Sequence, residues 1–248
     1  MTLLSDFESN PKTAKLLKEL GYEGVILHLA SANSAAEAVG RDITVCPLAA
    51  INLCIDPCLD HAGMGRFDSV QQARINRTVM YFNERPKFMA TLRRELVNLE
   101  KRASRKGLKP VARLDGTSDL GLAMQMHKEF PDTLYYDYTK VFRRYMRWLR
   151  DIPDNYHLTF SLGAGNRDDS LEVLRSGGNV AVVFRVKPLR KGTKLTIDHA
   201  LPAEWEGFEV IDGDRHDFRF TDPIGGRVIG LRAKGTAYRD RSGFVQEV

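Results

Sequence analysis

The sequence predicts a single α/β domain, residues 1–248, built as a partial or full (βα) barrel of the TIM type. Segments with a strand pattern alternate with helical segments six or seven times, without a break in composition between them. Most strand segments also end in polar or charged residues, which in a barrel would ring one pocket at the carboxyl ends of the strands. A doubly wound open sheet is the alternative, because it has the same alternation.

The composition is that of a globular protein, with 43% hydrophobic and 28% charged residues among 248. No apolar run approaches the roughly 20 residues that span a bilayer, so we expect no membrane partner. The first residues lack the basic and apolar regions of a secretory signal, which predicts a cytoplasmic protein. A net charge of +5 favours anionic partners only modestly.

The first half of the chain begins with an N-terminal segment, 1–22, whose residues 11–20 have the pattern of a short amphipathic helix. An apolar run at 24–31 is typical of a strand buried in a parallel sheet. Residues 32–68 are predicted to form a long loop, and loops of this length are usually functional. The expected elements that follow are a helix at 70–82 opened by a capping box of Ser69 and Gln72, a helix at 87–105 after Pro86, a strand at 110–115 and a helix at 120–130.

The second half continues the alternation of apolar, β-branched runs with amphipathic ones. Residues 187–206 interrupt this pattern as an excursion, and residues 235–248 form a polar tail. The expected elements are strands at 133–140, 156–161, 179–186, 207–214 and 227–234, a helix at 170–178, and a helix at 141–152 that buries Tyr145, Trp148 and Ile152.

The three cysteines, Cys46, Cys54 and Cys58, all lie in the loop that follows the first apolar strand. An odd number of cysteines in a cytoplasmic protein argues against disulfides. Three thiolates can hold three irons of a [4Fe–4S] cluster and leave the fourth iron open to bind and cleave S-adenosylmethionine. The alternatives are a zinc site with His61 as fourth ligand, or structural cysteines. The C-x7-C-x3-C spacing is unusual for zinc, whose ligands usually come in short pairs.

Polar residues that follow two other strands are candidates for holding the cofactor. Asp115, Gly116, Thr117 and Ser118 combine one carboxylate with several hydrogen-bond donors on a tight turn. Such a turn could hold amino and hydroxyl groups of a ligand, or it could cap the next helix through Ser118 or Asp119. We assign Ser161 and Asn166, at and after the strand 156–161, to the same cofactor.

Four residues are candidates for catalysis: Asp137, Lys140, His216 and Lys234. Asp137 and Thr139 share one face of a strand with Lys140 beside them, and a buried Asp–Lys pair can tune either group for proton transfer. A structural ion pair is the alternative. His216 belongs to an Asp-rich loop, and Lys234 ends the last strand. Because all follow strand ends, we expect Cys46, Asp115, Asp137, Ser161 and Lys234 to open onto one face.

Two groups of arginines are candidates for contacting nucleic-acid phosphates. Arg143, Arg144 and Arg147 lie on the polar face of the helix 141–152, where a solvated charged face is the alternative. Arg74 and Arg77 are three residues apart on the helix that follows the cysteine loop. Their alternative role is to pair with carboxylates of the barrel itself, such as Asp115 or Asp137.

Several long motifs resemble the gene product 88 family of phage and plasmid proteins, over a stretch from about His28 to Phe244. They include CPLAAINLCIDPCLDHAGMGRF, VQQARINRT, ARLDGTSD, NYHLTFS and DGDRHDFRF. The cysteine loop is also similar in layout to that of radical S-adenosylmethionine enzymes, which carry C-x3-C-x2-C after the first strand of a partial barrel. That resemblance implies a radical SAM-like barrel with a [4Fe–4S] cluster and S-adenosylmethionine as cofactors.

Together these features predict an iron–sulfur, radical S-adenosylmethionine-like enzyme of phage or plasmid origin. Its small-molecule substrate is unknown, and a nucleic-acid-related substrate fits the arginines. One alternative is a nucleic-acid-binding protein in which zinc, or the cysteines alone, stabilise a loop. Another is a metal-independent barrel enzyme acting on nucleotides or modified bases. The absence of a G-x-x-x-x-G-K-[ST] motif argues against a P-loop NTPase.

Overall fold

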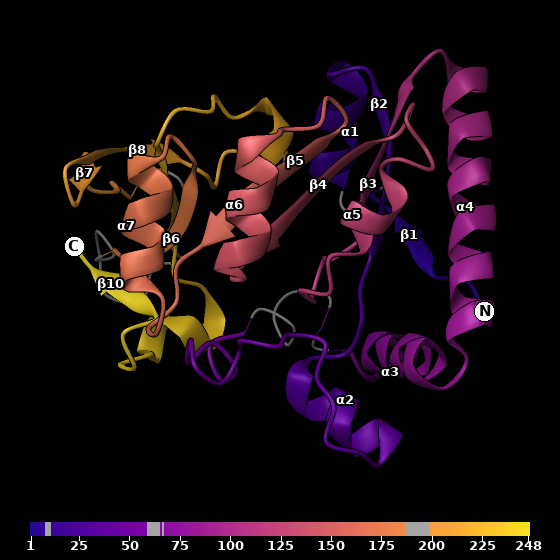
Figure 1. Ribbon diagram of the computed structural model, residues 1–248, viewed down its shortest axis with the longest axis horizontal. Coiled ribbons are helices and arrows are strands. Elements are labelled where there is room, and N and C mark those ends of the chain that lie inside the picture. Colours follow the sequence, from indigo (N-terminus) through magenta and orange to yellow (C-terminus); the bar gives the residue numbers. More distant parts are fainter. Residues whose placement is uncertain (8–10, 59–64, 66, 187–198) are drawn as a thin grey trace. The chain divides into compact units, whose positions relative to one another are not determined.

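The computed structural model describes residues 1–7, 11–58, 65, 67–186 and 199–248. Its ten described strands form a mixed sheet accompanied by helices, so the predicted α/β class is confirmed (Figure 1). The chain divides into two compact units. The first comprises Met1–Pro47, Met64–Asp137 and Ile152–His157, and the second comprises Leu48–Gly63, Tyr138–Asp151 and Leu158–Val248.

Parallel strands form the centre of the first unit. β2 (Tyr22–Leu27) pairs in parallel with β3 (Lys109–Arg113), and β3 pairs in parallel with β4 (Leu134–Thr139), whose last two residues belong to the second unit. A short strand, β1 (Leu4–Asp6), runs antiparallel to β2. The central strands are apolar and almost fully buried, as expected of a parallel sheet with both faces covered.

Five helices belong to the first unit among the described residues: α1 (Pro11–Glu19), α2 (Ala32–Val39), α3 (Asp68–Asn83), α4 (Arg85–Lys106) and α5 (Leu122–Met126). The longest, α4, packs against β2 and β3 through a buried stripe that includes Phe88, Leu92, Leu96 and Leu99 (Figure 1). It ends at Gly107, whose φ of 65° is the left-handed conformation common after a helix.

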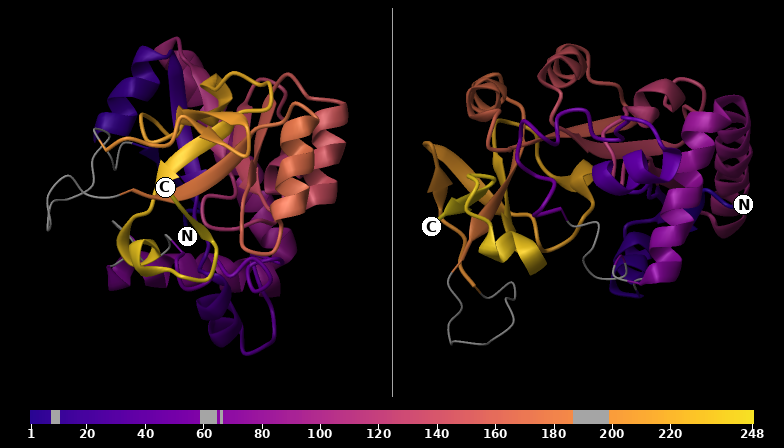
Figure 2. Two further views of the ribbon diagram at one scale, coloured as in Figure 1. Left: turned by 90° about the vertical axis from the view of Figure 1, so that its left-hand side faces the viewer. Right: turned by 90° about the horizontal axis from the view of Figure 1, so that it is seen from below.

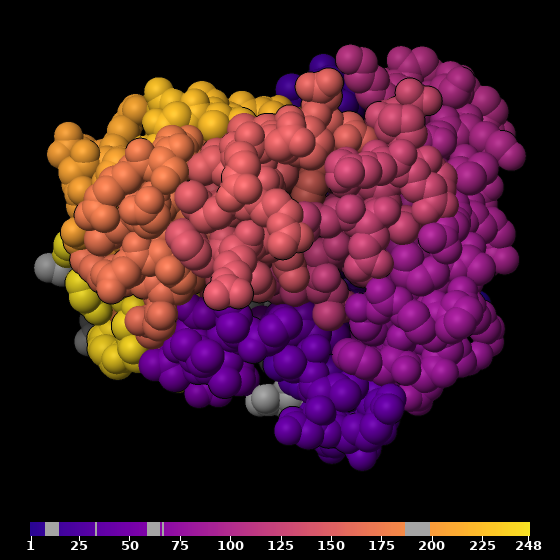
Figure 3. Space-filling model, in the orientation of Figure 1, coloured from indigo at the N-terminus to yellow at the C-terminus, as the bar shows by residue number. Residues whose placement is uncertain are grey.

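The second unit contains four parallel strands in the order β5 (Tyr156–Ser161), whose first two residues belong to the first unit, β6 (Val180–Arg185), β9 (Val228–Arg232) and β8 (Phe208–Asp212). β7 (Glu204–Trp205) runs antiparallel to β8, and β10 (Val245–Glu247) runs parallel to β6. The helices α6 (Phe142–Arg150) and α7 (Arg167–Arg175) lie side by side in front of β5 and β6 (Figures 1 and 2), and their side chains form part of the surface seen in Figure 3.

Several predicted boundaries are wrong. The loop 32–68 contains α2, an alanine-rich helix that stops at Gly40, and it includes the start of α3. The capping box is not formed, because α3 begins after Phe67 and Asp68 occupies its first turn. The N-terminal segment and the polar tail each include a strand, β1 and β10, and the tail also holds a 3-10 helix at Gly235–Arg239. Ile152 is 41% exposed rather than buried.

The predicted excursion at 187–206 is described only from His199, and its end contains β7. Residues 187–198 and His61, the candidate fourth zinc ligand, lie outside the described residues. Among the helices that the structure describes, none has the length and apolar character to cross a membrane.

Candidate functional site

The turn after β3 in the first unit is organised around the Asp115 carboxylate. That carboxylate accepts hydrogen bonds from the Ser118 hydroxyl at 2.5 Å and from the backbone N–H groups of Leu120, Gly121 and Leu122 at 2.8–3.0 Å. These N–H groups open α5, where no preceding helical carbonyl can accept them. The turn therefore caps the helix, with Asp115 as acceptor in place of Ser118 or Asp119.

The same turn is fixed to the chain that follows β2, and Cys46 lies against it. The Gly116 N–H donates to the Leu27 carbonyl at 3.0 Å, and a Cβ at Gly116 would lie 2.7 Å from that oxygen. The Thr117 hydroxyl donates to the Leu29 carbonyl at 2.7 Å. The Cys46 thiol contacts the Thr117 carbonyl at 3.8 Å, so Cys46 and the predicted cofactor turn share the carboxyl end of β3.

Asp137 of β4 is the most deeply buried predicted catalytic residue, at 1% exposure. Its Oδ1 atom accepts the Asp115 N–H at 2.8 Å, and its Oδ2 atom has no hydrogen-bond partner among the described residues. Burial, reinforced by the negative charge of Asp115, raises the pKa of Asp137 well above its ordinary value. Asp137 therefore favours the protonated form and is poorly suited to be the anionic half of an ion pair.

Arg74 and Arg77 are built into the first unit. Arg74 is buried in α3, and Arg77 donates to the Thr2 carbonyl at 3.1 Å and to the Ser5 hydroxyl at 3.4 Å. Burial and the charges of Arg74, Arg113 and Arg77 lower the pKa of His28 to about 3, so this imidazole is neutral. Binding of phosphate by Arg74 and Arg77 stays a prediction.

In the second unit, the segment 48–58 carries Cys54 and Cys58 and rests on the loop that follows β5. The Asn52 carbonyl accepts the Ala164 N–H at 3.1 Å, while the Asn52 side chain donates to the Leu48 carbonyl at 2.9 Å. A Cβ at Gly163 would lie 2.4 Å from Oδ1 of Asn52, so only glycine permits this approach. Both cysteines are free thiols and half-buried, and their segment meets the carboxyl end of β5 through Asn52.

Lys140 and Ser161 meet beside this segment. The Lys140 ammonium donates to the Ser161 hydroxyl at 2.5 Å and to the Leu162 carbonyl at 3.3 Å. Asn166 has a structural task, because its oxygen accepts the Gly163 N–H at 2.7 Å and its amide donates to the Ser161 carbonyl at 3.0 Å. The structure thus brings Lys140 and Ser161 together and uses Asn166 to brace their loop.

The ends of β8 and β9 carry a charged network. Arg232 makes a bidentate pair with Asp212 at 2.8 and 3.0 Å and also reaches Asp214 at 3.1 Å. Lys234 donates to the other Asp214 oxygen at 2.5 Å while staying exposed. Burial, followed by the charge of Arg219, lowers the pKa of His216, which favours the neutral imidazole.

The arginines of α6 differ in their surroundings. Arg143 and Arg147 are exposed, whereas Arg144 donates to the Thr139 hydroxyl at 3.3 Å and is half-buried. The exposed pair is spaced four residues apart and faces solvent on one side of the helix.

Sequence reasoning missed three buried arginines, Arg185, Arg219 and Arg232. Each bonds several groups at once, and Arg219 is fully buried while it pairs with Asp222 at 3.1 Å. The one sequence signal was their position in or beside apolar runs, where a charged side chain needs several partners.

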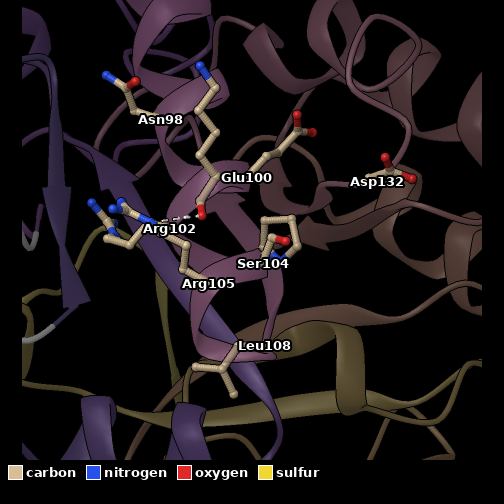
Figure 4. A pocket seen from close by; sticks show the side chains of 9 residues that line it. Asn98, Glu100, Arg102, Ser104, Arg105, Leu108 and Asp132 are labelled. Carbon is tan, nitrogen blue, oxygen red and sulfur yellow. Dashed lines mark hydrogen bonds between the residues drawn. The ribbon is translucent and has the colours of Figure 1, made fainter.

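A shallow hollow of about 780 Å³ lies elsewhere in the first unit (Figure 4). Its lining comes from the last turns of α4 and the chain just before β3 and β4, at the amino ends of these strands. Ligands of parallel α/β sheets bind at the carboxyl ends, so we do not assign the site to this hollow. The labelled lining residues are Asn98, Glu100, Arg102, Ser104, Arg105, Leu108 and Asp132.

The candidate metal ligands are divided between the units, with Cys46 in the first and Cys54 and Cys58 in the second. In the part of the chain that the structure describes, no group of three or more His, Cys, Asp or Glu side chains is assembled around a metal position. Within each unit, the cysteines do lie at the carboxyl ends of parallel strands.

Comparison with known proteins gives one match. The profile of a family described as gene product 88 matches residues 2–248, nearly the whole chain. No curated protein and no solved structure matches the sequence. Because the family profile covers far more than half of the sequence, the chain belongs to the gene product 88 family.

Proposed function

We propose that this protein is an iron–sulfur enzyme of the radical S-adenosylmethionine type, with its strands arranged as a partial or full barrel. Cys46, Cys54 and Cys58 would ligate three irons of a [4Fe–4S] cluster. A cluster held by three thiolates supplies an open iron that binds S-adenosylmethionine and delivers the electron for its reductive cleavage. The substrate would be a small molecule or a nucleic-acid-related group.

One observation supports the proposal above the others. Each compact unit, taken by itself, holds its cysteines at the carboxyl end of its parallel strands: Cys46 beside the turn after β3, and Cys54 and Cys58 beside the loop after β5. In the second unit the contact with that loop is made by Asn52, two residues before Cys54. The carboxyl ends of parallel strands are the edge at which α/β enzymes bind substrates and cofactors.

The donor chemistry fits a cluster. All three cysteines are free thiols and half-buried, which leaves them reachable by iron while partly shielded from water. The Cys46 and Cys54 thiols contact backbone carbonyls at 3.8 and 3.7 Å, which are weak bonds that metal ligation can replace. Thiolates are the ligands that iron–sulfur clusters select.

The neighbouring side chains have roles that do not depend on the metal. Lys140, fixed by Ser161 and the Leu162 carbonyl, presents a positive charge to a carboxylate or phosphate group. The Ser161 hydroxyl can bond a ligand hydroxyl or amino group. In the same unit His216 offers a neutral imidazole as proton acceptor, and Lys234 is an exposed donor positioned by Asp214.

Anaerobic purification followed by iron and sulfide reconstitution tests the proposal. We expect a brown protein that absorbs at about 400 nm and holds about four irons and four sulfides per chain. Each single replacement of Cys46, Cys54 or Cys58 by Ala should remove most of the iron. Ile51→Ala, at an exposed position in the segment that carries Cys54 and Cys58, should leave the iron content unchanged. A parent protein that stays colourless and iron-free after reconstitution would overturn the proposal.

A second candidate function is nucleic-acid binding with a structural zinc. The exposed Arg143 and Arg147 on α6 favour it, since each can contact a phosphate. A colourless protein with one zinc per chain, lost on replacing the cysteines, together with salt-sensitive DNA or RNA binding, would support this function instead.

A further inference from the structure

We propose that the 235–247 segment clamps the cysteine segment 48–58 in place, with Thr236 and Ser242 as positioning residues for Cys54 and Cys58. The inference deepens the proposed function, because two of the three cluster ligands are in the clamped segment. All the contacts that carry it lie within the second unit.

The first observation is a pair of hydrogen bonds from the 235–247 segment to the cysteine segment. The Thr236 hydroxyl donates to the Asp56 carbonyl at 3.2 Å, and the Ser242 hydroxyl donates to the Leu53 carbonyl at 3.5 Å. Leu53 directly precedes Cys54, and Asp56 lies between Cys54 and Cys58. The two bonds therefore hold the backbone on each side of Cys54.

The cysteine segment needs such support because it consists of turns rather than a helix or strand. Besides the two hydroxyls, the loop after β5 holds it through the bond from the Ala164 N–H to the Asn52 carbonyl. That bond is made at Asn52, two residues before Cys54. Ser242 and Thr236 add bonds at Leu53, next to Cys54, and at Asp56, midway between the two cysteines.

The 235–247 segment is itself firmly anchored, which a clamp requires. Arg185 at the end of β6 is buried and donates to Glu247 at 2.8 Å and to the carbonyls of Tyr238 and Asp240. The pairing of β10 with β6 adds a second attachment. Ala237 and Val245 of the segment also form a small apolar cluster with Ala233 and partly buried neighbours that include Val183 of β6.

The same segment reaches Lys140. The Lys140 ammonium lies 5.4 Å from the centre of the Phe244 ring, within the range of a cation–π contact. Phe244 is half-buried and lies over one side of the ammonium. The segment that bonds the cysteine segment therefore also contacts Lys140.

Hydrogen–deuterium exchange of the full-length, metal-free protein tests the clamp directly. The amides of Asn52, Leu53, Cys54 and Cys58 are bonded to carbonyls within the segment. In the double variant Thr236→Val/Ser242→Ala, we expect these amides to exchange about tenfold faster, because the segment opens more easily once the two bonds to its carbonyls are removed. The single variant Thr236→Ser keeps a hydroxyl at position 236 and the native Ser242, so it should keep most of the protection. Thr221→Val is the matched control, because the Thr221 hydroxyl bonds the Phe218 carbonyl of its own turn. Unchanged exchange at 52–58 in the double variant would overturn the inference.

A spectroscopic readout separates positioning from simple stability. In the reconstituted protein, the double variant should show an altered paramagnetic resonance spectrum of the reduced cluster at an unchanged urea midpoint. An identical spectrum and identical iron content would contradict the positioning role. If the parent protein takes up no iron, the proposed function fails, while the exchange measurement still decides the clamp by itself.

Discussion

The Oδ1 atom of Asp137 accepts a hydrogen bond of 2.8 Å from the backbone N–H of Asp115. The carboxylate of Asp115 is meanwhile occupied by the hydroxyl of Ser118 and the N–H groups that open α5. The two aspartates thus join the ends of β3 and β4 and order the turn against which Cys46 lies. Their environments differ, because Asp115 is surrounded by donors while Oδ2 of Asp137 has no bonding partner among the described residues.

The raised pKa of Asp137 makes stability depend on pH. The native state holds the proton more tightly than the unfolded chain, whose Asp titrates at about 3.9. The contribution of the Asp137 proton to the free energy of unfolding is therefore fully present below that pH. It falls by about 1.4 kcal/mol per pH unit as the pH rises toward the native pKa. Asp137→Asn keeps the acceptor without the charge, so its stability relative to wild type should increase with pH in this window.

Urea unfolding at a series of pH values measures this effect. Asp132→Asn, at an exposed position before β4, is the control and should leave the pH profile unchanged. Asp137→Ala should destabilise at every pH by about 1–3 kcal/mol, because the buried Asp115 N–H loses its acceptor. A pH profile of Asp137→Asn that runs parallel to wild type would contradict the assigned pKa.

Gly163 controls how closely the cysteine segment approaches β5. A Cβ there would lie 2.4–2.7 Å from three side-chain atoms of Asn52, so Gly163→Ala should displace the segment. We expect a loss of about 1–3 kcal/mol from overpacking, measured by urea unfolding, and less iron on reconstitution.

The compensating change is Asn52→Gly, which removes all three atoms that would clash. Added to Gly163→Ala, it should recover part of the iron uptake even though Asn52→Gly alone loses the bond to the Leu48 carbonyl. Additive losses in the double variant would show that the clash is not with Asn52.

The parallel strands were predictable from sequence because each is a short apolar run between helical patterns. The strands β1 and β10 were not, because each has only three residues and is defined by its partner, β2 or β6. Such pairing is decided by tertiary contacts that a local pattern does not contain. The helix α2 was not predicted, although four of its eight residues are alanine, the residue with the highest helix propensity.

The site was predictable where a residue follows a strand end, as for Asp115, Lys140 and Ser161. Partners drawn from distant segments were not predictable. Arg185 bonds groups 53 to 62 residues away along the chain, and no local sequence pattern predicts which groups these are. The task of Asn166 was likewise hidden, because its two bonds form only once the loop has folded around it.

Arg185 should be a major contributor to the stability of the second unit. Arg185→Ala leaves the carbonyls of Tyr238 and Asp240 without their donor, and it detaches Glu247. We expect a loss of about 2–4 kcal/mol in the free energy of unfolding, with faster proteolysis of the 235–247 segment. Arg185→Lys should recover little, because an ammonium cannot reproduce the forked geometry of the guanidinium.

Arg239→Ala is the matched control, since Arg239 is exposed on the same segment. It should change the unfolding free energy by less than about 0.5 kcal/mol. Equal effects of the two alanine variants would contradict the anchoring role of Arg185.

The exposed arginines of α6 give the sharpest test of a nucleic-acid partner. Each phosphate that is neutralised contributes about −0.7 to −0.9 to the slope of log affinity against log salt, through release of counterions. If Arg143 and Arg147 each contact a phosphate, Arg143→Gln/Arg147→Gln should weaken binding of DNA or RNA and make that slope shallower by about 1.4–1.8. Arg94→Gln/Arg175→Gln, whose arginines are exposed on α4 and α7, removes the same two charges and controls for net charge. Fluorescence anisotropy titrations at several salt concentrations measure both quantities. Wild-type protein that binds neither DNA nor RNA at low salt would leave the α6 arginines as a solvated face and a small molecule as the substrate.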